Sequence, residues 1–271
     1  MHPFEKFVTC LRNSIVPPRL AHALQVPYIA FLETITLGKG LPRCINNEPA
    51  IRIAPKYRFV PETYEPSVCA WVKERVKPGD VIFDVGAQFG VYALLGARWV
   101  APGGRIFAFE PSPETLSVLT RNVALNKAQG IVEVVPAAVG SDLGTATMFI
   151  VGTHDHNTLA SAAMGLINPL AIEVSVITLD TFSKERGVKP RLVKIDTEGW
   201  ELHVMRGAVE LLKADDILFV VEMHPYAWEG AGYGRDDMEN FLREHHLEAV
   251  PLTGQTDALA VYGDTFLRRV Q

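Results

Sequence analysis

The chain has 271 residues, of which 48% are hydrophobic and 21% charged, values close to the average of soluble globular proteins. This composition excludes a fibrous or intrinsically disordered chain. The formal net charge is −5, with no long basic run, which argues against electrostatic binding to nucleic acid. The 3 cysteines are scattered and never in C-x-x-C spacing, so we expect a reducing compartment and neither a disulfide framework nor a thiolate metal cluster.

The first residues carry no recognisable targeting segment. Charges at Glu5, Lys6 and Arg12 interrupt any apolar run, and the most apolar early stretch is broken by Pro27 and Glu33. A membrane-spanning helix needs about 20 predominantly apolar residues. We therefore expect a cytoplasmic, soluble protein with no membrane span.

Residues 1–55 differ from the rest of the chain. Two short amphipathic helical patterns are followed by a stretch rich in Pro and Gly around GKGLPR. This pattern predicts an N-terminal helical accessory region that packs on the remaining domain, residues 56–271, or joins two copies into a homodimer. A lid over a substrate is the functional alternative.

From about residue 66, short apolar runs alternate with helical patterns. The runs VIFDVGA, RIFAFEP, IVEVVPAAVG, RLVKID and ILFVVEMHP are typical of strands buried on both faces. The alternation predicts an α/β fold with a mostly parallel sheet of about seven strands and helices on both faces. Residues 141–180 predict a β insertion around a loop that contains His154 and His156, and the segments around LEAVPLTG and DALAVYGDTF predict a closing antiparallel hairpin.

A glycine-containing turn follows the first of these strands. Asp84, Gly86 and Gly90 have the spacing D-x-G-x-x-x-G, which differs from the dinucleotide fingerprint G-x-G-x-x-G. Glu110 ends the next strand, where a carboxylate can accept hydrogen bonds from both hydroxyls of a ribose. The turn and Glu110 together predict a nucleoside-containing cofactor.

Further polar residues stand at the ends of later strands. Asp196 ends RLVKID, and Glu222 and His224 end ILFVVEMHP, where alternation places both on one face. A histidine there can remove a proton from a hydroxyl. The structural alternatives are a helix cap for Asp196 and a packing role for His224. Glu198 and Glu201 are expected to stabilise the positive end of the following helix.

The order of these motifs resembles a known family. DVGAQFGVYALL, FEPSPETLSVLTRNVALN, AAVGSDLG, ITLDTF, KIDTEGWELHVMRGA and VVEMHP resemble the FkbM family of S-adenosylmethionine-dependent methyltransferases over about residues 58–225. The resemblance implies a class I methyltransferase fold, which is Rossmann-like, and S-adenosylmethionine as the cofactor of residues 56–271.

The resemblance also implies site residues. Asp84, Gly86 and Gly90 would line the methionine end of the cofactor, Glu110 would hold the ribose, and the AAVGSD segment would border the adenine. Gln88 stands where the family commonly has Asn. The cofactor-binding residues implied are Asp84, Gly86, Gln88, Phe89, Gly90, Glu110, Ala138 and Asp142.

The family is associated with O-methylation of small molecules, often sugars or polyketide-type natural products, so a small-molecule hydroxyl is the expected acceptor. His224 is the candidate general base, and Asp196 and Glu222 would orient the acceptor or hold Mg²⁺. No ligand set specifies a metal. Two alternatives remain: an NAD-dependent dehydrogenase, which the missing third glycine disfavours, and a non-catalytic cofactor-binding module.

Overall fold

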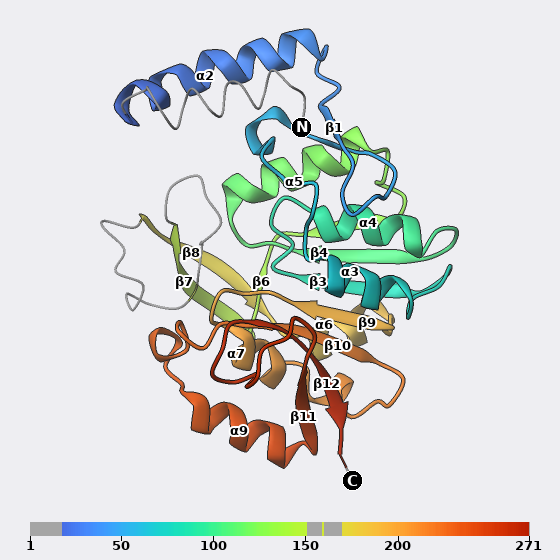
Figure 1. Cartoon of the computed structure of the whole chain (residues 1–271). Coiled ribbons are helices and arrows are strands. Elements are labelled where there is room, and N and C mark those ends of the chain that lie inside the picture. Colours follow the sequence, from blue (N-terminus) through green and yellow to red (C-terminus); the bar gives the residue numbers. More distant parts are fainter. Residues whose placement is uncertain (1–17, 151–158, 160–169, 271) are drawn as a thin grey trace.

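The computed structural model describes residues 18–150, 159 and 170–270. Its centre is a seven-stranded sheet in the order β11-β12-β10-β9-β3-β4-β5 (Figure 1). Its strands are β3 (Val81–Val85), β4 (Arg105–Phe109), β5 (Val132–Val135), β9 (Leu192–Ile195), β10 (Leu218–Met223), β11 (Leu247–Pro251) and β12 (Gly263–Arg269). The strands from β10 to β5 pair in parallel, and β12 runs antiparallel to both β10 and β11. The predicted class I α/β sheet is thus confirmed.

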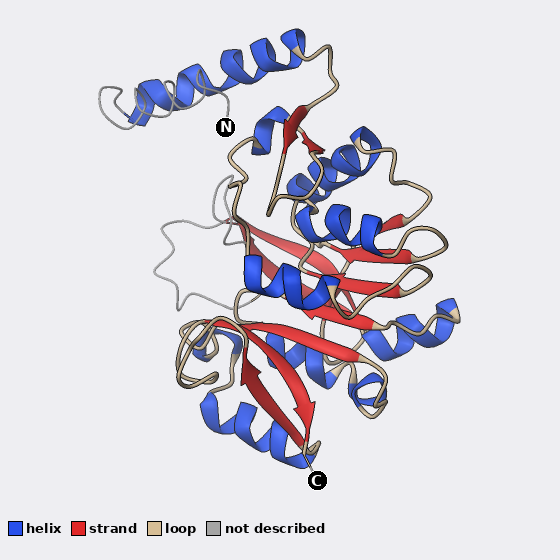
Figure 2. Ribbon diagram, turned by 45° about the vertical axis from the view of Figure 1, so that its right-hand side comes forward, coloured by secondary structure: helices blue, strands red, loops and turns tan. Residues whose placement is uncertain are grey.

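Helices cover both faces of this sheet (Figure 2). Ile82 and Leu192 face the first group of helices, whereas their neighbours Phe83 and Val193 face the second, because strand side chains alternate. The first group consists of α3 (Pro66–Lys73), α4 (Val91–Trp99) and α5 (Pro113–Leu125). The second consists of α6 (Leu179–Arg186), α7 (Glu201–Arg206), α8 (Val209–Leu212) and α9 (Arg235–Glu244).

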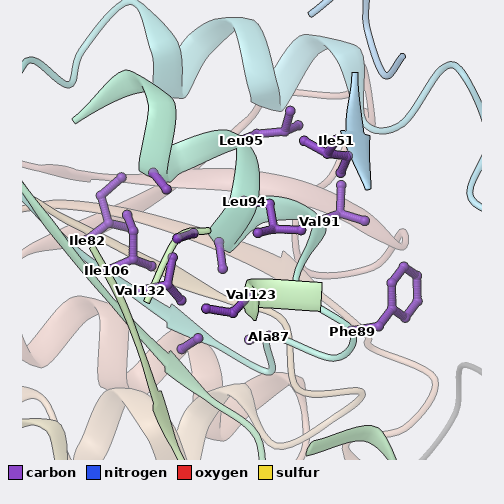
Figure 3. Close-up of a cluster of buried hydrophobic side chains, with 14 of the residues drawn as sticks. Ile51, Ile82, Ala87, Phe89, Val91, Leu94, Leu95, Ile106, Val123 and Val132 are labelled. Atoms are coloured by element: carbon purple, nitrogen blue, oxygen red, sulfur yellow. The ribbon is translucent and has the colours of Figure 1, made fainter. Parts of the chain in front are cut away.

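The N-terminal region contains a helix and a hairpin. Helix α2 (Pro18–Ile35) stands clear of the sheet in Figures 1 and 2. Strands β1 (Leu41–Arg43) and β2 (Ile51–Ile53) pair antiparallel, and Ile51 packs next to Leu95 of α4 (Figure 3). The hairpin was not anticipated from the sequence. The domain boundary at residue 55 and the lid or dimerisation role remain predictions, and residues 1–17 lie outside the described residues.

None of the helices in the described part of the chain combines the length and apolar character that crossing a bilayer requires.

The predicted β insertion forms a separate three-stranded sheet. It consists of β6 (Ala138–Val139), β7 (Gly144–Ile150) and β8 (Leu170–Ile177), with β7 and β8 antiparallel. The run IVEVVPAAVG, which we expected to be one strand, is divided at Pro136, because proline has no N–H to continue the ladder of β5. The predicted loop histidines, His154 and His156, lie outside the described residues.

The last strand begins later than its sequence suggests. A short turn precedes β12, in which the Asp257 carboxylate accepts a hydrogen bond from the Leu259 N–H and pairs with Arg235. The chain enters β12 at Gly263, directly after Tyr262. Because β12 pairs with β10, this turn brings Tyr262 to the carboxyl end of β10.

Candidate active site

Polar side chains replace apolar ones at the carboxyl ends of neighbouring strands. Asp84 on β3, Lys194 on β9 and Glu222 on β10 share the face that α3, α4 and α5 cover. Asp84 is directly opposite Lys194 in the register, and Glu222 is opposite Asp264 of β12. Each of the four is no more than 5% exposed. The sheet therefore builds one buried polar row from four strands.

A cavity opens at this end of the sheet, with about 950 Å³ of empty space including its mouth. Its lining contains five of the residues predicted to bind the cofactor: Asp84, Gly86, Gln88, Glu110 and Ala138. It also contains Asp196, one of the three predicted catalytic residues. Other lining residues include Tyr57, Tyr64, Tyr92, Thr115, Met148, Leu159, Lys194, Thr197, Glu198 and Trp200.

Gly86 lies where the end of β3 meets the backbone of Asp196. Its φ is +82°, and a Cβ built on it would lie 1.7 Å from the Asp196 carbonyl oxygen. The Asp196 N–H donates to the Val85 carbonyl at 2.9 Å, which holds the two segments together. Only glycine fits at this position, and its backbone forms part of the cavity lining.

Glu110 presents a fixed carboxylate to the cavity. Its Oε1 accepts a hydrogen bond from the Ser112 N–H at 2.9 Å, and its Oε2 accepts one from the Gln88 N–H at 3.0 Å. Burial nevertheless raises the pKa of Glu110 to about 7. Each carboxylate oxygen has a further lone pair, so the side chain suits a ligand that brings two hydroxyls, as a ribose does.

Asp84 carries an acceptor without a partner. Its side chain is 3% exposed, and among the described residues its Oδ2 has no hydrogen bond. Burial is the main cause that raises its pKa to about 7. A buried acceptor of this kind is costly unless a donor satisfies it. The ammonium group of S-adenosylmethionine would be such a donor, so the residues present fit this cofactor.

The other predicted cofactor residues do not line the cavity. Phe89 is buried and stacks on Tyr57 with ring centroids 5.0 Å apart. Gly90 has φ +89° and allows α5 to approach, because a Cβ would lie 2.4 Å from Leu119 Cδ1. Asp142 is exposed. Phe89 and Gly90 shape the turn, and a contact of Asp142 with adenine stays a prediction.

Lys194 is a central residue of the site that the sequence analysis missed. Its Nζ lies 3.1 Å from Asp196 Oδ2, 3.9 Å from Glu65 Oε2 and 4.4 Å from the centroid of the Tyr92 ring. Burial disfavours the charged form of Lys194. The negative charges of Asp196 and Glu65 have the larger effect and raise the pKa of Lys194 well above its usual value. A lysine inside the apolar run RLVKID was the available signal.

Asp196 and Glu222 are neighbouring carboxyl groups whose pKa values shift in opposite directions. Burial disfavours ionised Asp196, but Lys194 and then His224 lower its pKa. Burial and the charge of Asp196 raise the pKa of Glu222, and the Tyr262 hydroxyl donates a hydrogen bond to Glu222 Oε1. Near neutral pH the pair therefore holds one ionised and one protonated carboxyl group.

His224 lies between two glutamates. Its Nδ1 is 2.9 Å from Glu201 Oε1, and its Nε2 is 3.5 Å from Glu198 Oε2. Burial opposes the imidazolium, but the hydrogen bond and charge of Glu201, followed by Asp196 and Glu198, raise the pKa of His224 to about 10. Although His224 does not line the cavity, Glu198 does.

Glu201 begins α7, where the sequence predicted an acid that favours the helix end. Its side chain is fully buried, and it also accepts hydrogen bonds from the Trp228 indole N–H at 2.8 Å and the Tyr233 hydroxyl at 3.2 Å. These contacts fix the carboxylate that holds the His224 ring, a role that the local sequence did not indicate.

Two groups of side chains have donor atoms within 4.8 Å of one another, close enough to share a metal ion. One consists of Asp196, Glu198 and His224, and the other of Glu65, Asp196 and Glu222. The all-oxygen group matches the preference of Mg²⁺. However, the Lys194 ammonium already lies against Asp196 and Glu65, so Mg²⁺ stays a prediction.

Several known proteins resemble this chain in sequence. Residues 84–247 match the family model described as the methyltransferase FkbM domain. The hexuronic acid methyltransferase AglP of Haloferax volcanii is 29% identical over 196 residues, which cover 68% of this chain and 70% of AglP. The 31-O-demethyl-FK506 methyltransferase FkbM of Streptomyces tacrolimicus is 30% identical over 163 residues, 49% of this chain and 60% of that protein.

Among solved structures, the methyltransferase FkbM of Methylobacillus flagellatus KT superposes with a TM-score of 0.45 at 16% identity, and the match covers 73% of this chain and 49% of that chain. The family match includes Asp84, Glu110, Asp196 and His224, and it favours the methyltransferase interpretation over the dehydrogenase one. Because the family model spans more than half of the sequence, the chain belongs to the FkbM family of S-adenosylmethionine-dependent methyltransferases.

Proposed function

We propose that the protein is an O-methyltransferase that transfers the methyl group of S-adenosylmethionine to a hydroxyl of a sugar or polyketide-type natural product. The observation that supports the proposal most is the contact between the His224 imidazole and the buried Glu201 carboxylate. The other ring nitrogen of His224, Nε2, lies 3.5 Å from Glu198, which lines the cavity. A histidine held by a buried carboxylate is an arrangement that removes protons from hydroxyls. The names of the two relatives, which refer to a hexuronic acid and to FK506, support these two acceptor classes.

The cofactor, when bound, supplies an electrophilic methyl group on a sulfonium. Asp84 and Glu110 would bind its ammonium and ribose hydroxyls, and the open backbone at Gly86 lets it approach the strand end. A bound cation also favours the ionised forms of both carboxyl groups, whose pKa values burial raises to about 7. Because the reacting atoms must be in line, most of the rate gain is expected from positioning.

His224 is the proposed general base, and Asp196 and Glu222 are proposed to orient the acceptor hydroxyl. Since Glu201 raises the pKa of His224 to about 10, the neutral ring that can accept a proton becomes abundant only at alkaline pH. We therefore expect kcat/KM to rise with pH from 7 towards about 10. A rate that is flat over this range would contradict the base role.

The proposal is tested by incubating the purified protein with S-adenosylmethionine and a panel of hexosides and macrolide alcohols, with mass spectrometry to detect an added methyl group. Calorimetric titration with S-adenosylmethionine and with NAD runs in parallel, and only the first is expected to bind. Cofactor binding without methyl transfer to any member of the panel would favour the non-catalytic module.

The role of Mg²⁺ is tested separately, with the same assay after chelation by EDTA. If the all-oxygen group of Glu65, Asp196 and Glu222 needs a metal to acidify the hydroxyl, activity falls and added Mg²⁺ restores it. If Lys194 supplies the required positive charge, activity is unchanged.

A further inference from the structure

Two exposed tyrosines stand beside the catalytic end of the cavity. Tyr226 follows β10 and Tyr262 precedes β12, and these residues are 55% and 54% exposed. Their ring centroids lie 5.7 Å and 5.2 Å from that of His224 and 6.3 Å from each other. Segments far apart in the sequence thus place two aromatic faces in solvent around the buried histidine.

Each tyrosine hydroxyl is held by a carboxyl group. The Tyr226 hydroxyl donates to Glu198 Oε2 at 3.4 Å, and the Tyr262 hydroxyl donates to Glu222 Oε1. Glu198 also lines the cofactor cavity, so Tyr226 contacts a residue of the lining, and Tyr262 lies beside Tyr226. A buried hydrogen-bond acceptor nearby has no partner. Asp264 is 3% exposed, and among the described residues its Oδ1 has no hydrogen bond.

Anchored aromatic rings beside hydrogen-bond acceptors suit a particular ligand. The apolar face of a sugar ring packs on an aromatic face, and its hydroxyls donate to carboxylates. Exposed apolar groups that border a cavity commonly mark the place where a ligand binds. The tyrosine pair therefore has the chemistry of a platform for a polyhydroxylated ring.

The charges around the tyrosine pair favour an uncharged sugar over a negatively charged one. Glu198 is an acid that lines the cavity, and the nearby cations Lys194 and His224 already pair with Asp196 and Glu201, respectively. An acceptor with its own carboxylate would meet Glu198 here and find no unengaged cation among the cavity-lining residues that the structure describes. Like charges brought together in this way suppress binding of the wrong partner.

We propose that Tyr226, Tyr262, Glu198 and Glu222 form the acceptor subsite and that it takes an uncharged sugar ring in preference to a hexuronate. This inference deepens the proposed function and rests on it for the identity of the reaction. It separates this chain from the relative that is named a hexuronic acid methyltransferase.

The test measures acceptor binding without methyl transfer, in the presence of S-adenosylhomocysteine. Calorimetry compares methyl hexosides with the methyl hexuronides that have the same ring hydroxyls. We expect the best hexoside to bind about tenfold tighter than its hexuronide, which corresponds to about 1.4 kcal/mol. Equal or tighter binding of the hexuronide, or binding of neither sugar, would overturn the proposal.

Single substitutions test whether Tyr226, Tyr262 and Glu198 cause the preference for the hexoside. Tyr262→Ala and Tyr226→Ala should each weaken hexoside binding about tenfold and leave the affinity for S-adenosylhomocysteine unchanged, which also shows that the variants are folded. The matched control is Phe31→Ala, which removes a half-exposed ring on α2. Glu198→Gln should reduce the discrimination against the hexuronide, because it removes one of the repelling charges. Unaltered hexoside binding in both tyrosine variants would refute the subsite.

The two proposals fail in different ways. Selective hexoside binding without any methyl transfer from S-adenosylmethionine would support the subsite and contradict the proposed function. Methyl transfer to a hexuronide at the rate of the hexoside would support the function and overturn the subsite.

Discussion

The two sides of the cavity are built by different means. The proposed cofactor side comes from one short stretch, the β3–α4 turn and the end of β4, and it presents the carboxylates of Asp84 and Glu110, the second held by backbone N–H groups. The proposed acceptor side uses paired charges, with Lys194 against Asp196 and His224 against Glu201. These groups come from segments that the sheet topology brings together.

This difference predicts how each side responds to substitution. A backbone turn with isolated acids should lose ligand affinity residue by residue, because its groups act independently. A network of buried charges should lose turnover or stability when one member is removed, because the partner is left uncompensated. Single substitutions on the two sides test this contrast.

The largest effect is expected from His224→Ala. Loss of the proposed general base should lower kcat by about 10²–10⁴-fold. The affinity for S-adenosylmethionine should be unchanged, because His224 is not among the residues that line the cavity. Steady-state kinetics and calorimetry measure the two quantities. His245→Ala, at the end of α9, is the control, and an unchanged kcat in His224→Ala would remove His224 from the mechanism.

Lys194→Met should mainly affect stability. The substitution leaves Asp196 and Glu65 without their buried cation, and breaking a buried pair from one side costs about 3–5 kcal/mol of unfolding free energy. Urea denaturation monitored by circular dichroism measures this change. Lys189→Met provides the control, because Lys189 pairs with Asp216 on the surface and its loss should leave the urea midpoint where it is. Equal midpoints for the two variants would contradict a structural role of the Lys194 network.

The contrast between the two sides also explains what the sequence could predict. The glycine turn and Glu110 lie within residues 84–110, so their spacing alone indicated the cofactor side, and the sheet followed from the alternation of apolar runs. Gly90 directly precedes α4; it gives room to Leu119 and is not among the residues that line the cavity.

The acceptor side could not be predicted in this way. Glu65, Tyr262 and Asp264 lie outside the stretch that the family model matches, and only the pairing of β12 with β10 brings the last two to the site. The sequence already explained Glu201 as an acid at the positive end of a helix, so its contact with His224 was not predicted. Lys194 alone had a usable signal, as a charge within a buried strand.

On the cofactor side, Glu110→Gln should weaken binding of S-adenosylmethionine about tenfold or more, since a hydrogen bond to a charged group contributes about 1.5–3 kcal/mol. At saturating cofactor, kcat should be nearly unchanged. Glu114→Gln, on α5 and paired with Lys56 at the surface, is the matched control. A loss of kcat without a loss of affinity would mean that Glu110 acts on turnover, as His224 is expected to do. It would contradict the proposed difference between the two sides of the cavity.

The smallest expected effect is a shift of the pH profile in Glu201→Gln. The amide keeps the shape of the side chain but removes the charge that raises the pKa of His224 to about 10. The pKa should therefore fall towards its usual value of about 6.5, and the neutral ring becomes available at lower pH. The rise of kcat/KM with pH should move down by at least about one unit, a change of about 1.4 kcal/mol in the relative stability of the two protonation states.

Glu198→Gln distinguishes a specific pair from a general charge effect. Glu198 lies 3.5 Å from Nε2, whereas Glu201 lies 2.9 Å from Nδ1, so the shift in Glu198→Gln should have the same direction and be smaller. If both variants keep the wild-type profile, the titrating group is not His224, and the acceptor side does not work through the Glu201 pair. If the shifts are equal, His224 responds to the summed charge of the acids, and Glu201 has no special part in setting its pKa.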